Sequence, residues 1–158
     1  MTIREKAAMM KLDSSKMAST DIAVRNAALE KIAESLLAGK ERIFEANAKD
    51  MERAQADNIS PAVIKRLKFS EAKLSDAIAG IHNLIALPDP LFQIQLKRQL
   101  DEGLTLVRET CPIGVIGVIF EARPDAMVQI AFYVSRVAIV QFLKVEVRPE
   151  KRTSFFLN

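Results

Sequence analysis

The sequence predicts an α/β protein, and three changes of pattern along the chain carry that prediction. Apolar residues recur at helical spacing through most of the first 86 residues. The pattern changes to short strand-like runs between residues 95 and 109. Beyond them lies Val115–Phe120, an apolar run rich in β-branched residues, which a polar turn and a helical pattern follow. Helices, a hairpin and the start of a β-α-β unit describe an α/β chain that is cut off early.

Capping and stop residues set the bounds of the helices. Four helices are predicted: from about residue 4 to 18, from a cap cluster at Ser19-Thr20-Asp21 to Gly39, from about 40 to 57, and from Ser70 to the stop after residue 86. A short turn at 61–67 precedes the last helix, and the first helix is only loosely amphipathic. Ser60 and Ser70 are candidate N-caps, and Gly39 is a natural C′ residue at the end of the second helix. The segment Leu87-Pro88-Asp89-Pro90 ends the last one, because proline lacks an amide donor and restricts the residue before it.

The strand region begins with a predicted β-hairpin. Its two arms, Gln95–Leu100 and Leu104–Glu109, flank the link Asp101-Glu102-Gly103, which contains a glycine. The run Val115–Phe120 follows, and its uniform apolarity is typical of a strand buried on both faces, the first of a parallel sheet. A helix should start near Asp125. Polar residues that end such a strand lie where open α/β sheets bind their ligands.

Composition excludes several classes of protein. No apolar run approaches the length of a membrane span, and the charged N-terminus is not a signal segment, so we expect a cytoplasmic protein. One cysteine cannot form an internal disulfide, and with one histidine it cannot build a typical zinc site. The net charge is +3, but residues 1–131 hold 18 basic and 18 acidic side chains. Because the excess lies wholly in the tail, we do not expect a nucleic-acid partner.

The strand and its exit, residues Gly114–Pro124, resemble the γ-glutamyl phosphate reductases, a family within the aldehyde dehydrogenase superfamily. Three upstream features fit the same family in the same order. They are Ala46-Asn47-Ala48-Lys49-Asp50, the stop at Leu87–Pro90, and the hairpin turn that closes with Gly103. Together the matching pieces cover residues from about 10 to 131.

The resemblance implies an architecture. Residues 1–131 would be the N-terminal part of an aldehyde dehydrogenase-like NADP-binding domain, with the hairpin at about 94–110 belonging to an oligomerisation flap. Members of this family are expected to be homo-oligomers. The expected cofactor-binding positions are Phe120, Glu121, Ala122, Arg123, Pro124 and Lys144. A plain structural reading of Glu121 and Arg123, as a salt-bridged turn into the next helix, stays open beside this one.

The resemblance also implies a reaction. A cysteine thiolate attacks γ-glutamyl phosphate, phosphate leaves, and hydride from NADPH reduces the resulting thioester to glutamate 5-semialdehyde, a step in proline biosynthesis. The family's nucleophile lies downstream of the segment that this chain shares with it. Cys111 is not expected to replace it, because it precedes Pro112 at a strand entrance with no histidine nearby in sequence.

The resemblance stops after Ala131, and the codons suggest why. Read one nucleotide out of frame, the residues from 133 onward permit a Leu-Cys-Leu-Lys-Ser-Gly-Asn segment and then Ala-Ile-Leu-Lys-Gly-Gly, as the family pattern requires. We therefore interpret residues 132–158 as an out-of-frame tail, with the catalytic domain absent. Lys144 coincides with the family lysine, but Val145 and Glu146 stand where glycines would let the cofactor approach. The chain as written should be inactive and poorly stable.

Two other functions stay open at this point. A small basic helical module that binds nucleic acid or protein would rest on the pI of 9.1 and the basic tail. A non-catalytic fragment that pairs with intact reductase subunits is the second.

Overall fold

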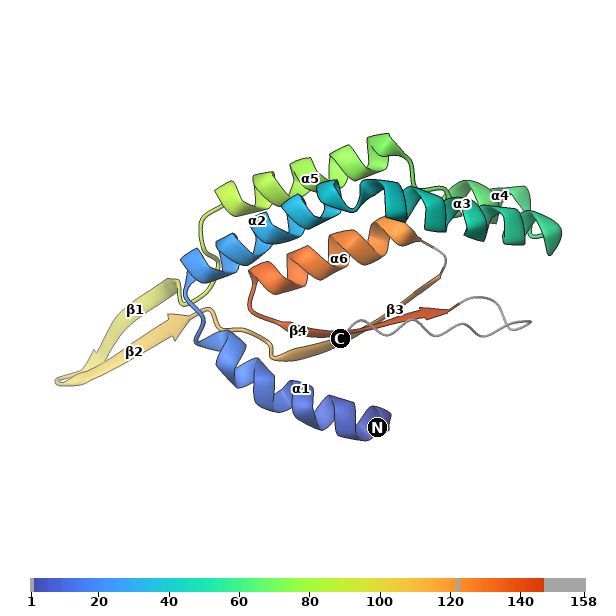
Figure 1. Ribbon diagram of the computed structural model, residues 1–158. Helices are drawn as coiled ribbons and strands as arrows, with labels where there is room; N and C mark the ends of the chain where they lie inside the picture. Colours follow the sequence, from blue (N-terminus) through green and yellow to red (C-terminus); the bar gives the residue numbers. More distant parts are fainter. Residues whose placement is uncertain (1, 122, 147–158) are drawn as a thin grey trace.

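The computed structural model describes residues 2–121 and 123–146, and over these residues it confirms an α/β fold (Figure 1). The helices are α1 (Ile3–Ala18), α2 (Ile22–Ala38), α3 (Lys40–Ala56), α4 (Pro61–Leu67), α5 (Glu71–Ala86) and α6 (Pro124–Arg136). The strands are β1 (Ile94–Asp101), β2 (Leu104–Glu109), β3 (Val115–Glu121) and β4 (Val140–Glu146). The sheet extends one strand further than predicted, because residues of the tail complete α6 and form β4.

The cap cluster before α2 and the cap at Ser70 are confirmed, but Ser60 makes no side-chain capping bond at the start of α4, and the role of Gly39 also differs from the prediction. Asp21 accepts a hydrogen bond from the amide of Ala23 at 2.7 Å, and Ser70 accepts one from the amide of Lys73 at 3.4 Å. Gly39 has a φ of −88°, so it is not a left-handed C′ residue, and α3 starts immediately after it. Its lack of a side chain still matters, since a Cβ there would lie 3.1 Å from the carbonyl oxygen of Ser35.

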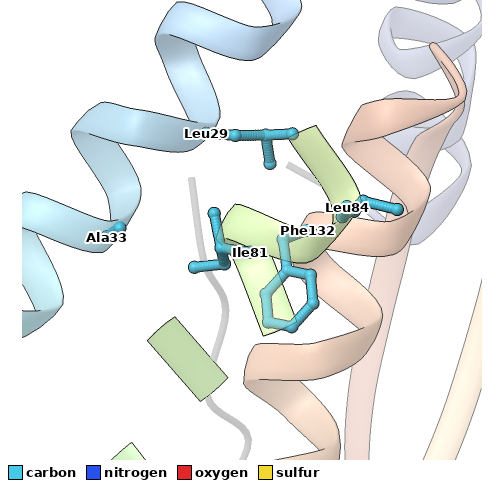
Figure 2. Close-up of a cluster of buried hydrophobic side chains, with 5 residues drawn as sticks. All are labelled: Leu29, Ala33, Ile81, Leu84 and Phe132. Carbon is cyan, nitrogen blue, oxygen red and sulfur yellow. The ribbon is translucent and has the colours of Figure 1, made fainter. Parts of the chain in front are cut away.

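Helices α2, α5 and α6 pack side by side and enclose the main hydrophobic core (Figures 1 and 2). Its buried members are Leu29, Ala33, Ile81, Leu84 and Phe132. Leu29 and Ala33 are one helical turn apart in α2, and Ile81 and Leu84 share the inner face of α5. Phe132 of α6 is 1% exposed, and its ring lies 3.7 Å from where a Cβ on Gly80 would stand. The core therefore depends on a side chain that follows Ala131.

The predicted hairpin is present and extends away from the helices (Figure 1). Strands β1 and β2 are antiparallel, and Asp101 pairs with Leu104, so the turn contains two residues instead of the predicted three. Gly103 has a φ of +74°, a conformation that favours glycine. All residues of both strands are exposed, including Ile94, Leu100 and Leu104. The two-stranded sheet therefore buries nothing on either face.

Strands β3 and β4 are parallel and are joined through α6, so the chain completes one β-α-β unit. Figure 1 shows α6 on one side of the two strands and α1 on the other. The prediction that Val115–Phe120 is buried on both faces is wrong, because Ile119 is 67% exposed and none of these residues is fully buried. Within the described residues β3 has one neighbouring strand, and α1 contributes no buried side chain.

Candidate functional site

The exit of β3 holds most of the positions that the sequence singled out. β3 ends at Glu121, and α6 begins at Pro124, whose fixed φ suits the first position of a helix. Arg123 precedes this proline and has an extended φ of −132°, as a residue before proline should. Its side chain is exposed, whereas Phe120 and Pro124 are half-buried. Ala122 lies outside the described residues.

The register of the parallel strands brings Lys144 to the same edge of the sheet. Ile119 pairs with Lys144, Phe120 with Val145, and Glu121 with Glu146. The carboxyl ends of β3 and β4 therefore lie side by side, next to the N-terminus of α6, and this is where α/β folds bind nucleotides. The structure thus groups the neighbours Phe120 and Glu121 with Lys144, although Lys144 lies 23 residues beyond Glu121 in the sequence.

A carboxylate lies at this edge in the first turn of α6. It belongs to Asp125, at a place where the helix dipole would otherwise attract an anion. Lys73 Nζ lies 3.6 Å from Asp125 Oδ2, but Asp125 Oδ1 is buried without a hydrogen-bond partner. The start of α6 therefore does not suit a dinucleotide phosphate.

Cys111 lies at the opposite end of β3 from this turn. It is exposed and precedes the strand by four residues. A seven-residue strand is about 20 Å long, so the thiol is far from the strand's carboxyl end. The Nε2 of His82 lies 3.4 Å from a carboxylate oxygen of Glu30 on α2, so this histidine is paired with a group other than Cys111.

Asn47 belongs to the sequence pattern that resembled the reductases, and in the structure it joins α3 to the segment between α4 and α5. Its side-chain amide donates to the carbonyl of Leu67 at 2.9 Å, and its oxygen accepts from the amide of Phe69 at 2.8 Å. These bonds fix the segment between α4 and α5 against α3. Asn47 therefore has a structural role.

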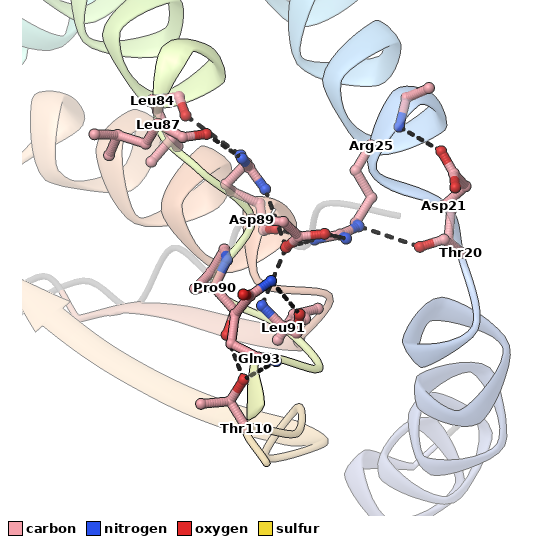
Figure 3. A network of polar contacts seen from close by, with 12 residues as sticks. Thr20, Asp21, Arg25, Leu84, Leu87, Asp89, Pro90, Leu91, Gln93 and Thr110 are labelled. Carbon is pink, nitrogen blue, oxygen red and sulfur yellow. Dashed lines mark hydrogen bonds and ion pairs between the residues drawn. The ribbon is translucent and has the colours of Figure 1, made fainter. Parts of the chain in front are cut away.

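One buried polar cluster was missed by the sequence analysis. It consists of Arg25, Asp89 and Arg136 (Figure 3). A signal was available, because Arg25 occupies the same helical stripe as Leu29 and Ala33, positions that otherwise face the core. A charged residue on such a stripe requires a buried partner.

The chain can now be compared with known proteins. No family model matches it. The γ-glutamyl phosphate reductase of Ruminiclostridium cellulolyticum is 48% identical over 131 residues, which cover 83% of this chain and 30% of the relative. The same enzyme of a Picosynechococcus species is 51% identical over 115 residues, covering 73% of this chain and 27% of the relative. The shared segment belongs to the γ-glutamyl phosphate reductase family.

Two solved γ-glutamyl phosphate reductases have the same fold. The crystal structure of the Saccharomyces cerevisiae enzyme matches with a TM-score of 0.87 at 30% identity, covering 92% of this chain and 38% of that one. The Thermotoga maritima enzyme matches with a TM-score of 0.85 at 27% identity, covering 89% and 34%. The match falls on the N-terminal part of these reductases. The chain spans about 30% of the length of the curated reductases it matches.

The described residues offer neither a membrane span nor a metal site. None of the helices there combines the length and apolarity that a bilayer span needs. The same residues contain no group of three histidine, cysteine or acidic side chains placed to hold a metal ion.

Proposed function

We propose that this chain is the N-terminal part of a γ-glutamyl phosphate reductase, whose complete form makes glutamate 5-semialdehyde from γ-glutamyl phosphate with NADPH in proline biosynthesis. The observation that carries the proposal is the 48% identity over 131 residues to a curated reductase. The TM-score of 0.87 to a solved reductase supports it at the level of the fold. A basic binding module is disfavoured, because a chance likeness would not extend over 83% of the chain.

We propose further that the complete enzyme would use the turn at 120–124 as part of its cofactor cleft and the hairpin at 94–110 for oligomerisation. The turn lies at the carboxyl edge of a parallel strand pair, the usual place for a nucleotide. The hairpin carries exposed apolar side chains on a two-stranded sheet, and such sheets are only marginally stable alone. A covering partner would account for these side chains.

The chain by itself should have no reductase activity, because the family's nucleophile is expected downstream of the shared segment and the exposed Cys111 lies at the opposite end of β3 from the expected cofactor edge. The test is an assay of the purified chain with glutamate 5-semialdehyde, phosphate and NADP⁺, with an intact relative as the positive control. We expect no NADPH to form. Formation of NADPH that depends on phosphate and saturates with semialdehyde would contradict the proposal.

The cofactor part of this proposal has its own test. Titration of NADPH into the purified chain, followed by its nicotinamide fluorescence, should show no saturable binding. The double substitution Val145→Gly and Glu146→Gly removes one acidic side chain and both Cβ atoms from the strand edge, so weak binding should appear. If the unaltered chain binds NADPH as well as the double variant does, the edge is not the obstacle.

We propose that residues 132–158 arose by a one-nucleotide change of reading frame. Support comes from the codon pattern of the tail and from the 131-residue length of the match to a curated reductase. Sequencing the gene should reveal that restoring one base near codon 132 opens a long frame for the rest of a reductase. A gene that contains no such frame would refute this origin.

A further inference from the structure

Two arginines from distant helices meet one carboxylate at the end of α5. Arg25 of α2 is 5% exposed and Arg136 of α6 is 1% exposed. Arg25 donates to both oxygens of Asp89, and its Nε donates to the carbonyl of Thr20 at 3.2 Å (Figure 3). Nη1 of Arg136 lies 3.5 Å from Asp89 Oδ1. Asp89 is thus held between the two guanidinium groups.

The second positive charge is balanced by carbonyl groups at helix ends. Arg136 donates from Nε to the carbonyl of Leu84 at 3.3 Å and from Nη2 to that of Leu87 at 2.8 Å, both at the C-terminus of α5. Arg25 donates to the carbonyl of Arg136 itself at 2.6 Å, at the C-terminus of α6. These ends carry the negative pole of each helix, so buried cations are stabilised there.

The cluster continues into the base of the hairpin. The amide of Leu91 donates to Asp89 Oδ1 at 3.1 Å. The hydroxyl of Thr110 then donates to the carbonyl of Pro90 at 2.6 Å and accepts from the amide of Gln93 at 3.0 Å (Figure 3). A backbone pair joins the same two segments, since the amide of Thr110 donates to the carbonyl of Gln93 at 3.1 Å. Both ends of the hairpin are therefore tied to Asp89 through Pro90 and Leu91.

Every residue of β1 and β2 is exposed, so burial within the strands cannot fix the direction in which they extend. At the base of the hairpin, Leu91 is buried, and the prolines on both sides of Asp89 restrict the backbone. The carboxylate of Asp89 contacts both α2 and α6, and Arg136 also binds the carbonyl of Leu87 in the same segment. These polar contacts are a route by which the helices can orient the hairpin.

We propose that Asp89, clamped by Arg25 and Arg136, is a positioning residue that fixes the direction of the β1–β2 hairpin relative to the helices. Because Arg136 belongs to α6, the direction of the hairpin depends on the packing of α6. Thr110 completes the connection, because its hydroxyl bonds to Pro90 in the turn that contains Asp89 and to Gln93 before β1. This inference does not depend on the reaction proposed above.

The test measures the direction of the hairpin instead of its stability. Spin labels are attached at Glu102→Cys in the hairpin turn and at Ala27→Cys on the exposed face of α2, in a Cys111→Ser chain. Pulsed electron paramagnetic resonance then gives the distribution of distances between the two spin labels. We expect one narrow distribution in this parent chain and a broader one after Asp89→Asn or Arg136→Met.

Two further variants separate positioning from general loosening. Thr110→Val keeps the shape of the side chain and lies outside the helical core, so it should broaden the distribution while the helical circular dichroism stays unchanged. It also covers the case in which Asp89→Asn or Arg136→Met fails to fold. Arg98→Met removes a guanidinium from the hairpin itself and should change nothing. A broad distribution in the parent chain, or an unchanged one in Thr110→Val, would overturn the proposal.

Discussion

Phe132 and Arg136 follow the point at which the resemblance to the reductases ends, yet both are almost completely buried. Phe132 fills the space between α2 and α5, and Arg136 binds the end of α5. The sequence analysis assigned neither residue a role, because it treated the tail as foreign to the fold. Burial at these positions depends on helical spacing, and the spacing of α6 continues across Ala131.

Phe132→Ala should strongly destabilise the chain. Deleting a fully buried phenylalanine ring costs about 3–5 kcal/mol, since apolar contacts are lost and a cavity remains. Tyr133→Ala is the matched control, because Tyr133 is the next residue and is 53% exposed. Urea unfolding followed by circular dichroism measures both. Equal losses in the two variants would mean that Phe132 is not part of the core.

Asp89 should make the chain sensitive to acid. Burial raises the pKa of its carboxyl, but the hydrogen bonds from Arg25 and the Leu91 amide and the charges of Arg25 and Arg136 outweigh burial and hold the pKa below 3.8. A lowered folded pKa means that the stabilisation is present at neutral pH and is lost as the pH falls below 3.8 through the folded pKa.

Asp89→Asn should remove this pH dependence and also weaken the fold at neutral pH. Taking one partner from a buried ion pair costs on the order of 3 kcal/mol. The measurement is the free energy of unfolding at neutral pH and at several acidic values. Asp76→Asn changes an exposed carboxylate on α5 and serves as the control. An acid response that is the same in Asp89→Asn and the parent chain would show that another group causes it.

At the scale of elements, the strands differ most from what their sequence indicates. The apolar composition of β3 predicted a strand buried on both faces. Composition indicates that a strand can pack against apolar neighbours, but it does not show whether neighbouring strands and helices are present on each side. Ile119 is 67% exposed, and β3 has one neighbouring strand among the described residues. The main helices lie close to where they were predicted, because caps and stops are local signals, as at Ser70 and the Leu87–Pro90 stop, whereas α4 was expected only as a short turn.

The open edge and exposed face of β3 should cause self-association. Apolar strands without neighbours pair with one another, and a lysine on the exposed face opposes such pairing. Ile119→Lys should therefore increase the fraction of monomer seen by analytical ultracentrifugation without lowering stability. Ile113→Lys is the control, since Ile113 is 79% exposed but lies outside the strand. If both variants are as associated as the parent chain, β3 is not the contact.

At the scale of the whole molecule, the fold class could be predicted from the changes of pattern along the chain, and the family from Gly114–Pro124 together with the upstream features that fit it. The neighbourhood of Phe120, Glu121 and Lys144 could be predicted only through the family, since no local signal sets the pairing of β3 with β4. The stripe position of Arg25 indicates a buried partner, but Asp89 and Arg136 could not be identified as its partners, because they lie more than 40 residues from it and meet it only after three helices have packed. Long-range polar contacts leave few traces in a single sequence.

We proposed above that this chain is the first part of a γ-glutamyl phosphate reductase and that its residues from about 132 onward are read out of frame. Growth without proline tests it directly, in a bacterial strain that lacks its own reductase. The gene is expressed as it stands and with one nucleotide restored near codon 132. We predict that only the restored gene supports growth. Growth with the unaltered gene, or none with the restored one despite soluble full-length protein, would contradict the account.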